Sequence, residues 1–167
     1  MAPLNAFLVG FWLAGLQVGL YMALQVRCTA ALPSFLAVTT GWLMGSLAGL
    51  WLPRRGAPLA LGLACLAPYL LLGWLERASF RPELLPLFTL LVALTGLYAG
   101  SFFRSQLPAF SSPGLLFFWE NNGFLVGLGA SSLAILFWGV RVAWLWPAGG
   151  ILLIGLGLAR KGPGSLL

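Results

Sequence analysis

Six apolar runs, each about as long as a membrane-spanning helix, occupy nearly the whole chain and limit it to one class of fold. A helix needs roughly 20 apolar residues to cross the hydrocarbon core, whereas barrel strands would show short alternating segments. Of 167 residues, 60% are hydrophobic and 7% are charged, far below the roughly 25% charged residues of soluble domains. We therefore expect an all-α, polytopic membrane bundle that forms a single integral membrane domain over residues 1–167. The expected spans are residues 5–26, 33–52, 58–75, 84–103, 114–138 and 142–159.

Turn-forming residues mark the ends of these spans. Pro53-Arg54-Arg55-Gly56 closes the second span, and a charged turn over residues 76–83 separates the third from the fourth. The last span contains Pro147-Ala148-Gly149-Gly150, and proline and glycine in a helical pattern predict a break there.

Basic residues in the short connections predict the orientation. With the N-terminus inside, five of the nine basic residues are cytoplasmic and four lie outside. The outer turn offsets its two arginines with Glu76 and Glu83, whereas the paired clusters Arg54-Arg55 and Arg160-Lys161 both fall inside. Because cytoplasmic loops carry the excess of basic residues, we expect an inner (cytoplasmic) membrane protein with both termini in the cytoplasm.

The composition excludes several kinds of site. The chain has no histidine and two cysteines, so we expect no metal site, and the thiols should stay free because they lie at different depths. No nucleophile–histidine pair, phosphate-binding loop or carboxylate pair is present, so we expect neither enzyme activity nor a cofactor. The net charge of +6 lies at span ends, where the lipid bilayer, and not nucleic acid, is the expected partner.

One five-residue pattern occurs twice, 82 positions apart. Gly41-Trp42-Leu43-Met44-Gly45 lies in the second span, and Gly123-Phe124-Leu125-Val126-Gly127 lies in the fifth. The second and fifth spans are equivalent positions of a three-plus-three arrangement. An odd number of spans per repeat makes the two copies run in opposite directions, as inverted repeats require. The pattern therefore favours a 3+3 inverted repeat.

Small residues recur at every fourth position within these two spans. Gly41, Gly45 and Gly49 share one face of the second span, and Gly123 and Gly127 share one face of the fifth. Such faces let the backbone of a neighbouring helix approach closely. Helix packing accounts for the pattern, and the alternative is that these faces slide or rock during alternating access.

Glu120 is the only acidic residue inside an expected span, and it is followed by Asn121 and Asn122. A charge at the centre of a span costs about 2.5–3.5 kcal/mol on insertion scales, so such residues often have a function. Three roles are open for this carboxylate. It could bind a cationic group or a proton, pair with Arg104 or Arg54, or stay protonated and hydrogen-bond between helices.

Gln17 and Gln25 place two amides on roughly one face of the first span. Each either lines a cavity or hydrogen-bonds to another helix. Gln17, Glu120, Asn121 and Asn122 form the expected solute-binding set.

Part of this sequence resembles a known family. The residues that carry the resemblance are Phe7-Leu8-Val9-Gly10, Gln17, Ser34-Phe35-Leu36-Ala37-Val38, Gly41 to Gly49, Pro53-Arg54-Arg55, Gly96, Gly100, Phe103 and Trp119-Glu120-Asn121-Asn122-Gly123. Together they look like the membrane domain of spermidine-synthase-like membrane proteins, a unit related to the major facilitator superfamily. Met22 departs from the family, which has an arginine shortly after the first-helix amide or acid. The aminopropyltransferase domain is missing, so the resemblance implies a six-helix facilitator-like unit and not polyamine synthesis.

Two functions remain open. The first is a transporter-like half-unit of facilitator type that carries a small solute as a homodimer or with a partner, with Glu120 favouring a cationic solute. The second is a non-catalytic accessory subunit that packs into a larger membrane complex. The duplicated pattern favours the first, and the scarcity of polar groups within the spans favours the second. A lipid- or quinone-facing role is a third alternative.

Overall fold

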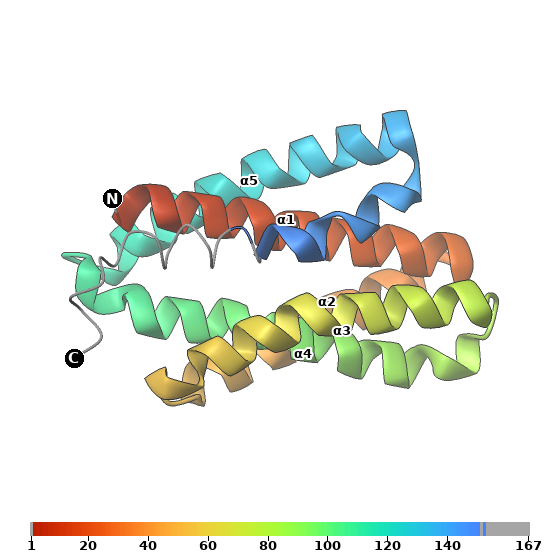
Figure 1. Cartoon of the computed structure of the whole chain (residues 1–167), viewed down its shortest axis with the longest axis horizontal. Coiled ribbons are helices and arrows are strands. Elements are labelled where there is room, and N and C mark those ends of the chain that lie inside the picture. The colour runs from red at the N-terminus through yellow and green to blue at the C-terminus, as the bar shows by residue number, and fades with distance from the viewer. Residues whose placement is uncertain (1, 151, 153–167) are drawn as a thin grey trace.

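The computed structural model describes residues 2–150 and 152, and the regular elements within them are all helical (Figure 1). The five long helices are α1 (Ala2–Arg27), α2 (Ala31–Trp51), α3 (Ala57–Arg77), α4 (Leu85–Gln106) and α5 (Pro113–Trp138). All five are long and apolar enough to cross a membrane. The prediction of an all-α, polytopic membrane bundle is confirmed, and each helix begins and ends within three residues of a predicted span.

Short connections join these helices. They contain the 3₁₀ helices η1 (Arg54–Gly56), η2 (Pro82–Leu84), η3 (Leu107–Ala109) and η4 (Val140–Trp144). A proline lies in the first turn of α3, α4 and α5, where its missing N–H leaves no helical hydrogen bond unmade. The Ser112 hydroxyl caps α5 by accepting a hydrogen bond of 3.3 Å from the Leu115 N–H. These local signals fix the helix starts close to where the sequence predicts them.

The α1 helix occupies the middle of the bundle and contacts α2, α3, α5 and η4 (Figure 1). Most of its side chains are buried, from Ala6 to Leu24. In contrast, α5 keeps most of its surface exposed, and its buried residues are Leu116, Gly123, Gly127, Ser131 and Ile135. In a membrane bundle such an exposed apolar surface can face lipid, whose tails are as apolar as Leu side chains, or it can pack against another protein.

Helices α2 and α4 run in the same direction and approach each other through glycine. A Cβ atom at Gly45 would overlap the carbonyl oxygen of Ala93, and one at Gly49 would overlap that of Leu97. Larger residues at either position would force the two backbones apart. Contact this close is typical of small-residue packing between membrane helices.

Helices α1 and α5 form a second parallel pair of the same kind. Cβ atoms at Gly123 and Gly127 would overlap the carbonyl oxygens of Phe7 and Phe11, and one at Gly10 would overlap the carbonyl oxygen of Glu120. The glycine faces of the second and fifth spans therefore contact different partners, α4 and α1.

The two helix pairs share one contact register. The contacts are Gly41–Thr89 and Gly45–Ala93 in one pair, and Gly123–Phe7 and Gly127–Phe11 in the other. In every case the equivalent residues are 82 positions apart, so exchanging the two halves of the chain maps one set of contacts onto the other. A 3+3 repeat predicts this relation. The repeat itself stays a prediction, because residues 151 and 153–159 of the sixth expected span lie outside the described residues.

The chain after α5 turns back along α1 (Figure 1). Gly139, with φ of 74°, ends α5, and after η4 the residues 146–150 are helical again. The predicted break near Pro147 is therefore wrong, since the interruption lies earlier, at Gly139 and η4. Pro147 sits in the first turn of the new helical segment, where a proline is tolerated. Within the sixth predicted span, residues 151 and 153–159 lie outside the described part of the chain.

Candidate functional site

Glu120 lies beside α1, with its backbone carbonyl against Gly10. Its side chain is half-buried, and the ion pairs among the described residues do not include it. The alternative in which Glu120 pairs with Arg104 or Arg54 is not observed. The Arg104 guanidinium instead donates hydrogen bonds of 3.0 and 3.1 Å to the carbonyl oxygens of Leu50 and Leu52. These carbonyls lie at the C-terminal end of α2, where helices leave acceptors without partners.

Asn121 and Asn122 have different surroundings, although they are adjacent in sequence. The Asn122 amide donates a hydrogen bond of 2.7 Å to the Phe118 carbonyl oxygen of its own helix. Asn121 is exposed. One residue along a helix turns the side chain by about 100°, so Glu120, which lies beside α1, and the exposed Asn121 lie on different faces of α5.

Gln17 is half-buried on α1, and Gln25 is exposed near its end. Gln17 follows Gly10 by seven residues, which places it about 10 Å further along the helix axis than the point where Glu120 meets α1. The four residues of the expected solute-binding set therefore do not form one cluster in this structure. Glu120 and Gln17 occupy different depths beside α1, and Asn121 points away from the bundle.

An aromatic cluster around Trp12 is the most connected feature of the interior, and the sequence did not reveal it. The Trp12 indole N–H donates a hydrogen bond of 2.6 Å to the Trp146 carbonyl oxygen. The Trp12 ring meets Tyr98 of α4 edge to face, with ring centroids 5.7 Å apart. A Cβ atom at Gly150 would lie 2.6 Å from the Cys65 Sγ of α3 and from the Trp12 ring. The cluster therefore ties the segment after η4 to α1 and α3.

A cavity of about 720 Å³ lies between the C-terminal half of α5 and the chain that follows it. It is lined by Ala134, Trp138, Arg141, Val142, Leu145, Trp146, Ala148, Gly149 and Leu152. Arg141 is the only charged residue in this lining, and its side chain is exposed. The cavity suits an apolar occupant and lacks the several converging polar groups of a site for a small polar solute.

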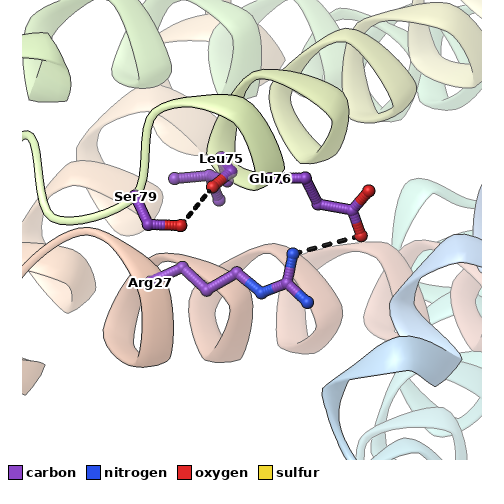
Figure 2. Close-up of polar contacts among 4 residues, drawn as sticks. All are labelled: Arg27, Leu75, Glu76 and Ser79. Atoms are coloured by element: carbon purple, nitrogen blue, oxygen red, sulfur yellow. Dashed lines mark hydrogen bonds and ion pairs between the residues drawn. The ribbon is translucent and has the colours of Figure 1, made fainter.

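The C-terminal ends of α1 and α3 are joined by a polar clasp (Figure 2). The Arg27 guanidinium lies 3.1 Å from the Glu76 carboxylate, and the Phe80 N–H donates to the Arg27 carbonyl oxygen at 2.6 Å. Ser79 donates to the Leu75 carbonyl oxygen at 2.7 Å. The clasp is partly exposed, so the ion pair contributes about 0–1 kcal/mol. Its arrangement fits a structural role.

The two cysteines are free and buried. Cys28 follows the end of α1, and its thiol donates to the Arg81 carbonyl oxygen at 3.6 Å. Burial raises the pKa of this thiol, and the Glu83 carboxylate raises it further. Cys28 is therefore protonated at neutral pH and unsuited to act as a nucleophile.

Comparison with known proteins adds no further assignment. No protein family, curated protein or solved structure matches this chain. In the part of the chain that the structure describes, no three histidine, cysteine or acidic side chains gather as a metal site would require. The resemblance to the spermidine-synthase-like membrane domain rests on the residues quoted for it and stays a prediction.

Proposed function

We propose that this chain is a transporter-like half-unit of facilitator type that handles a small cationic solute as a homodimer or with a partner. The observation that supports the proposal is the shared register of the α2–α4 and α1–α5 contacts, in which equivalent residues are 82 positions apart. Inverted repeats of this kind build many transporters, because two similar halves allow alternate opening toward the two sides of the membrane.

Glu120 is the group that we propose contacts the cation. Among the described residues it is the only acidic one in the interior of a helix, since Glu76 lies at the end of α3 and Glu83 lies in η2. Its side chain is half-buried, and no described basic residue neutralises it. An intramembrane carboxylate with this environment would attract a cation or a proton. Asn121, Asn122 and Gln17 are proposed as further polar groups along the path of the solute. The two asparagines follow Glu120 on α5, and Gln17 lies at a different depth on α1.

We propose that the protein lies in the inner (cytoplasmic) membrane with both termini in the cytoplasm. Arg54 and Arg55 of η1 and Arg104 of α4 then lie at the cytoplasmic side, and the Arg27–Glu76 clasp lies at the outer side. Five of the nine basic residues, including both paired clusters Arg54-Arg55 and Arg160-Lys161, fall inside in this orientation, and the positive-inside rule favours the side with more of them.

One observation favours the second function, a non-catalytic accessory subunit of a larger membrane complex. The cavity next to α5 is lined almost entirely by apolar side chains. Among the described residues, the buried polar side chains are all small hydroxyls: Ser34, Thr95 and Ser131, which bond to nearby carbonyl oxygens, and Ser101. An interior of this kind suits a packing role better than passage of a polar solute.

Uptake into liposomes separates the two functions. We expect the reconstituted protein to take up methylammonium, choline or putrescine faster than protein-free liposomes do. Glu120→Gln should slow the initial rate by about tenfold, as expected for the loss of about 1.4 kcal/mol of interaction with the cation. Glu83→Gln is the matched control and should keep the wild-type rate, because Glu83 is exposed outside the spans and pairs with Arg81.

Uptake at the protein-free rate for all three cations would reject the transport proposal, as would equal rates for the wild-type protein and Glu120→Gln. In that case the accessory function predicts a stoichiometric membrane partner that survives purification in mild detergent. Native mass spectrometry of the purified protein would detect such a complex.

A further inference from the structure

The face of α5 that points away from the bundle contains one group that does not suit lipid. We define the outer face of α5 as Phe118, Asn121, Leu125, Leu128 and Ser132, all of which are exposed. The opposite side of the helix, with Gly123 and Gly127, packs against α1. Four of these five residues can face either lipid or protein, and the exception is the Asn121 amide.

Asn121 lies well inside the hydrocarbon region. The α5 helix has 26 residues and is therefore about 39 Å long, whereas the hydrocarbon core is about 30 Å thick. Asn121 lies between four and five residues from the middle of the helix, or about 7 Å along its axis. Even with some tilt, this position is below the headgroup level.

The Asn121 amide has two donors and an acceptor, and it forms no hydrogen bond with the described residues. The exposed serines and threonines in the spans can satisfy themselves, since their hydroxyls bond to carbonyls one turn earlier. Asn122 also does so, through Phe118. Gln25 is exposed as well, but it lies two residues from the end of α1. An amide without a partner in hydrocarbon costs several kcal/mol. The outer face of α5 is therefore expected to be covered.

We propose that a second copy of this chain covers it, with the two α5 helices crossing at Asn121 about a two-fold axis along the membrane normal. An isologous contact uses the same surface on both copies, so a residue on the two-fold axis faces its own equivalent. An amide suits this position because each copy can donate a hydrogen bond to the side-chain carbonyl of the other. The outer face contains no charged residue, so the pairing brings no like charges together. Glu120 lies on another face of the helix, beside α1.

The spacing along the outer face supports the same geometry. Phe118, Asn121, Leu125, Leu128 and Ser132 follow each other at intervals of three, four, three and four residues. This alternation is the seam of a parallel, left-handed helix pair. The inference uses only the described surface of α5 and does not depend on transport, although such a dimer would supply the second half-unit that the proposed function needs.

The dimer can be tested by measuring association in liposomes over a series of protein-to-lipid ratios, with single-molecule photobleaching of the labelled full-length chain. We expect a wild-type dimer, and Asn121→Leu should weaken it by about 3- to 30-fold, the range for interhelical hydrogen bonds in membranes. Asn122→Leu is the matched control and should leave association unchanged, because Asn122 bonds within its own helix.

Disulfide cross-linking in native membranes provides a second measurement that needs no purified variant. Asn121→Cys and Leu125→Cys should form covalent dimers on mild oxidation, whereas Asn122→Cys and Val126→Cys should not. Val126 is a fair control because its side chain is 53% exposed but lies off the outer face. The wild-type chain shows the background, since Cys28 and Cys65 are buried.

Three results would overturn the inference. They are a monomer at every protein-to-lipid ratio, equal cross-linking at Asn121 and Asn122, and a cross-link from Asn121→Cys to a different protein in place of a second copy. Solute uptake is measured separately: uptake by a chain that fails these tests would reject the dimer alone, and a dimer without uptake would reject the transport proposal alone.

Discussion

Helices α1 and α5 separate toward the end of α5 (Figure 1), whereas the glycine contacts between α2 and α4 continue close to the end of α2. In the α2–α4 pair, the glycine contacts continue to Gly49 and Gly100, which meets the Ser46 carbonyl oxygen. The Arg104 guanidinium then binds the final carbonyls of α2. This interface is closed from the middle of the membrane to one end.

The α1–α5 pair has the same contact register as the α2–α4 pair, but its glycine contacts stop before the end of α5. After the contact of Gly127 with Phe11, the next glycines of α1 no longer meet α5. A Cβ atom at Gly15 would overlap the Trp146 ring, and one at Gly19 would lie 3.2 Å from the Cβ of Ala143. The chain after η4 takes the place that α5 leaves, and the 720 Å³ cavity lies between the two.

The difference shows that a shared glycine motif sets how close two helices come, but not how far along they stay together. Where the next contact is again glycine against backbone, the pair continues. Where a large aromatic ring is available, as at Trp146, it fills the space over glycine and excludes the helix. We therefore expect α5 to move relative to α1 more readily than α2 moves relative to α4.

The largest expected effect comes from adding a methyl group at equivalent glycines of the two pairs. Gly45→Ala should destabilise the protein by about 2–3 kcal/mol, because α2 is held on both sides of this position and cannot move away from Ala93. Gly127→Ala should cost about 1–2 kcal/mol, since α5 can tilt outward. The free energy of unfolding in bicelles, measured by steric trapping, would show the difference.

Gly62→Ala is the control for this comparison. A Cβ atom there has no neighbour within 4 Å, so the substitution should be neutral or slightly stabilising through its helix propensity. Equal losses at Gly45 and Gly127 would contradict the proposed difference in freedom between α2 and α5.

A smaller effect is expected from the hydrogen bond that holds the last described segment on α1. Trp12→Phe keeps an aromatic ring but removes the donor to the Trp146 carbonyl oxygen, which should cost about 1–2 kcal/mol. Amide hydrogen exchange should become faster in residues 143–150 and stay unchanged in α2 and α4. Trp74→Phe, at a tryptophan that is 47% exposed, is the control. Faster exchange throughout the bundle would show that Trp12 supports the whole core and not this segment.

The spans of this protein could be predicted from the sequence because the bilayer sets their length. Prolines and charged turns mark their ends, so α1 to α5 lie within three residues of the prediction. The break near Pro147 was misplaced because the same residue suits both a kink and the first turn of a helix. Gly139, which ends α5, gave no signal distinct from the other glycines of the chain.

The partners of each residue were much harder to predict than the helices. A glycine face shows that some backbone comes close, but Gly45 and Gly127 contain no information on whether α4 or α1 is that backbone. The alternative that paired Glu120 with Arg104 considered only opposite charges. The structure gives Arg104 the carbonyls of Leu50 and Leu52, which become available only where α2 ends. Contacts such as Trp12–Trp146 join residues 134 positions apart and depend on the whole fold.

The smallest expected effect is at Arg104, and it tests why only one pair stays closed at its end. Arg104→Gln removes a charged donor from the Leu50 and Leu52 carbonyls, which should cost about 0.5–1 kcal/mol because the site is exposed. The position 82 residues earlier holds Met22, which cannot donate a hydrogen bond, so α1 has no equivalent means of holding the end of α5.

Amide exchange at the Leu52 N–H, which bonds to Gly49 at 3.2 Å, should become about three- to fivefold faster in Arg104→Gln, which corresponds to the upper part of that range of free energy. Arg104→Lys should restore part of the protection, since a cation still interacts favourably with the C-terminal end of a helix. Unchanged exchange in Arg104→Gln would mean that the glycine contacts alone hold α2 against α4. The separation of α5 from α1 would then follow from competition by Trp146 for the surface over Gly15, and not from the missing donor at Met22.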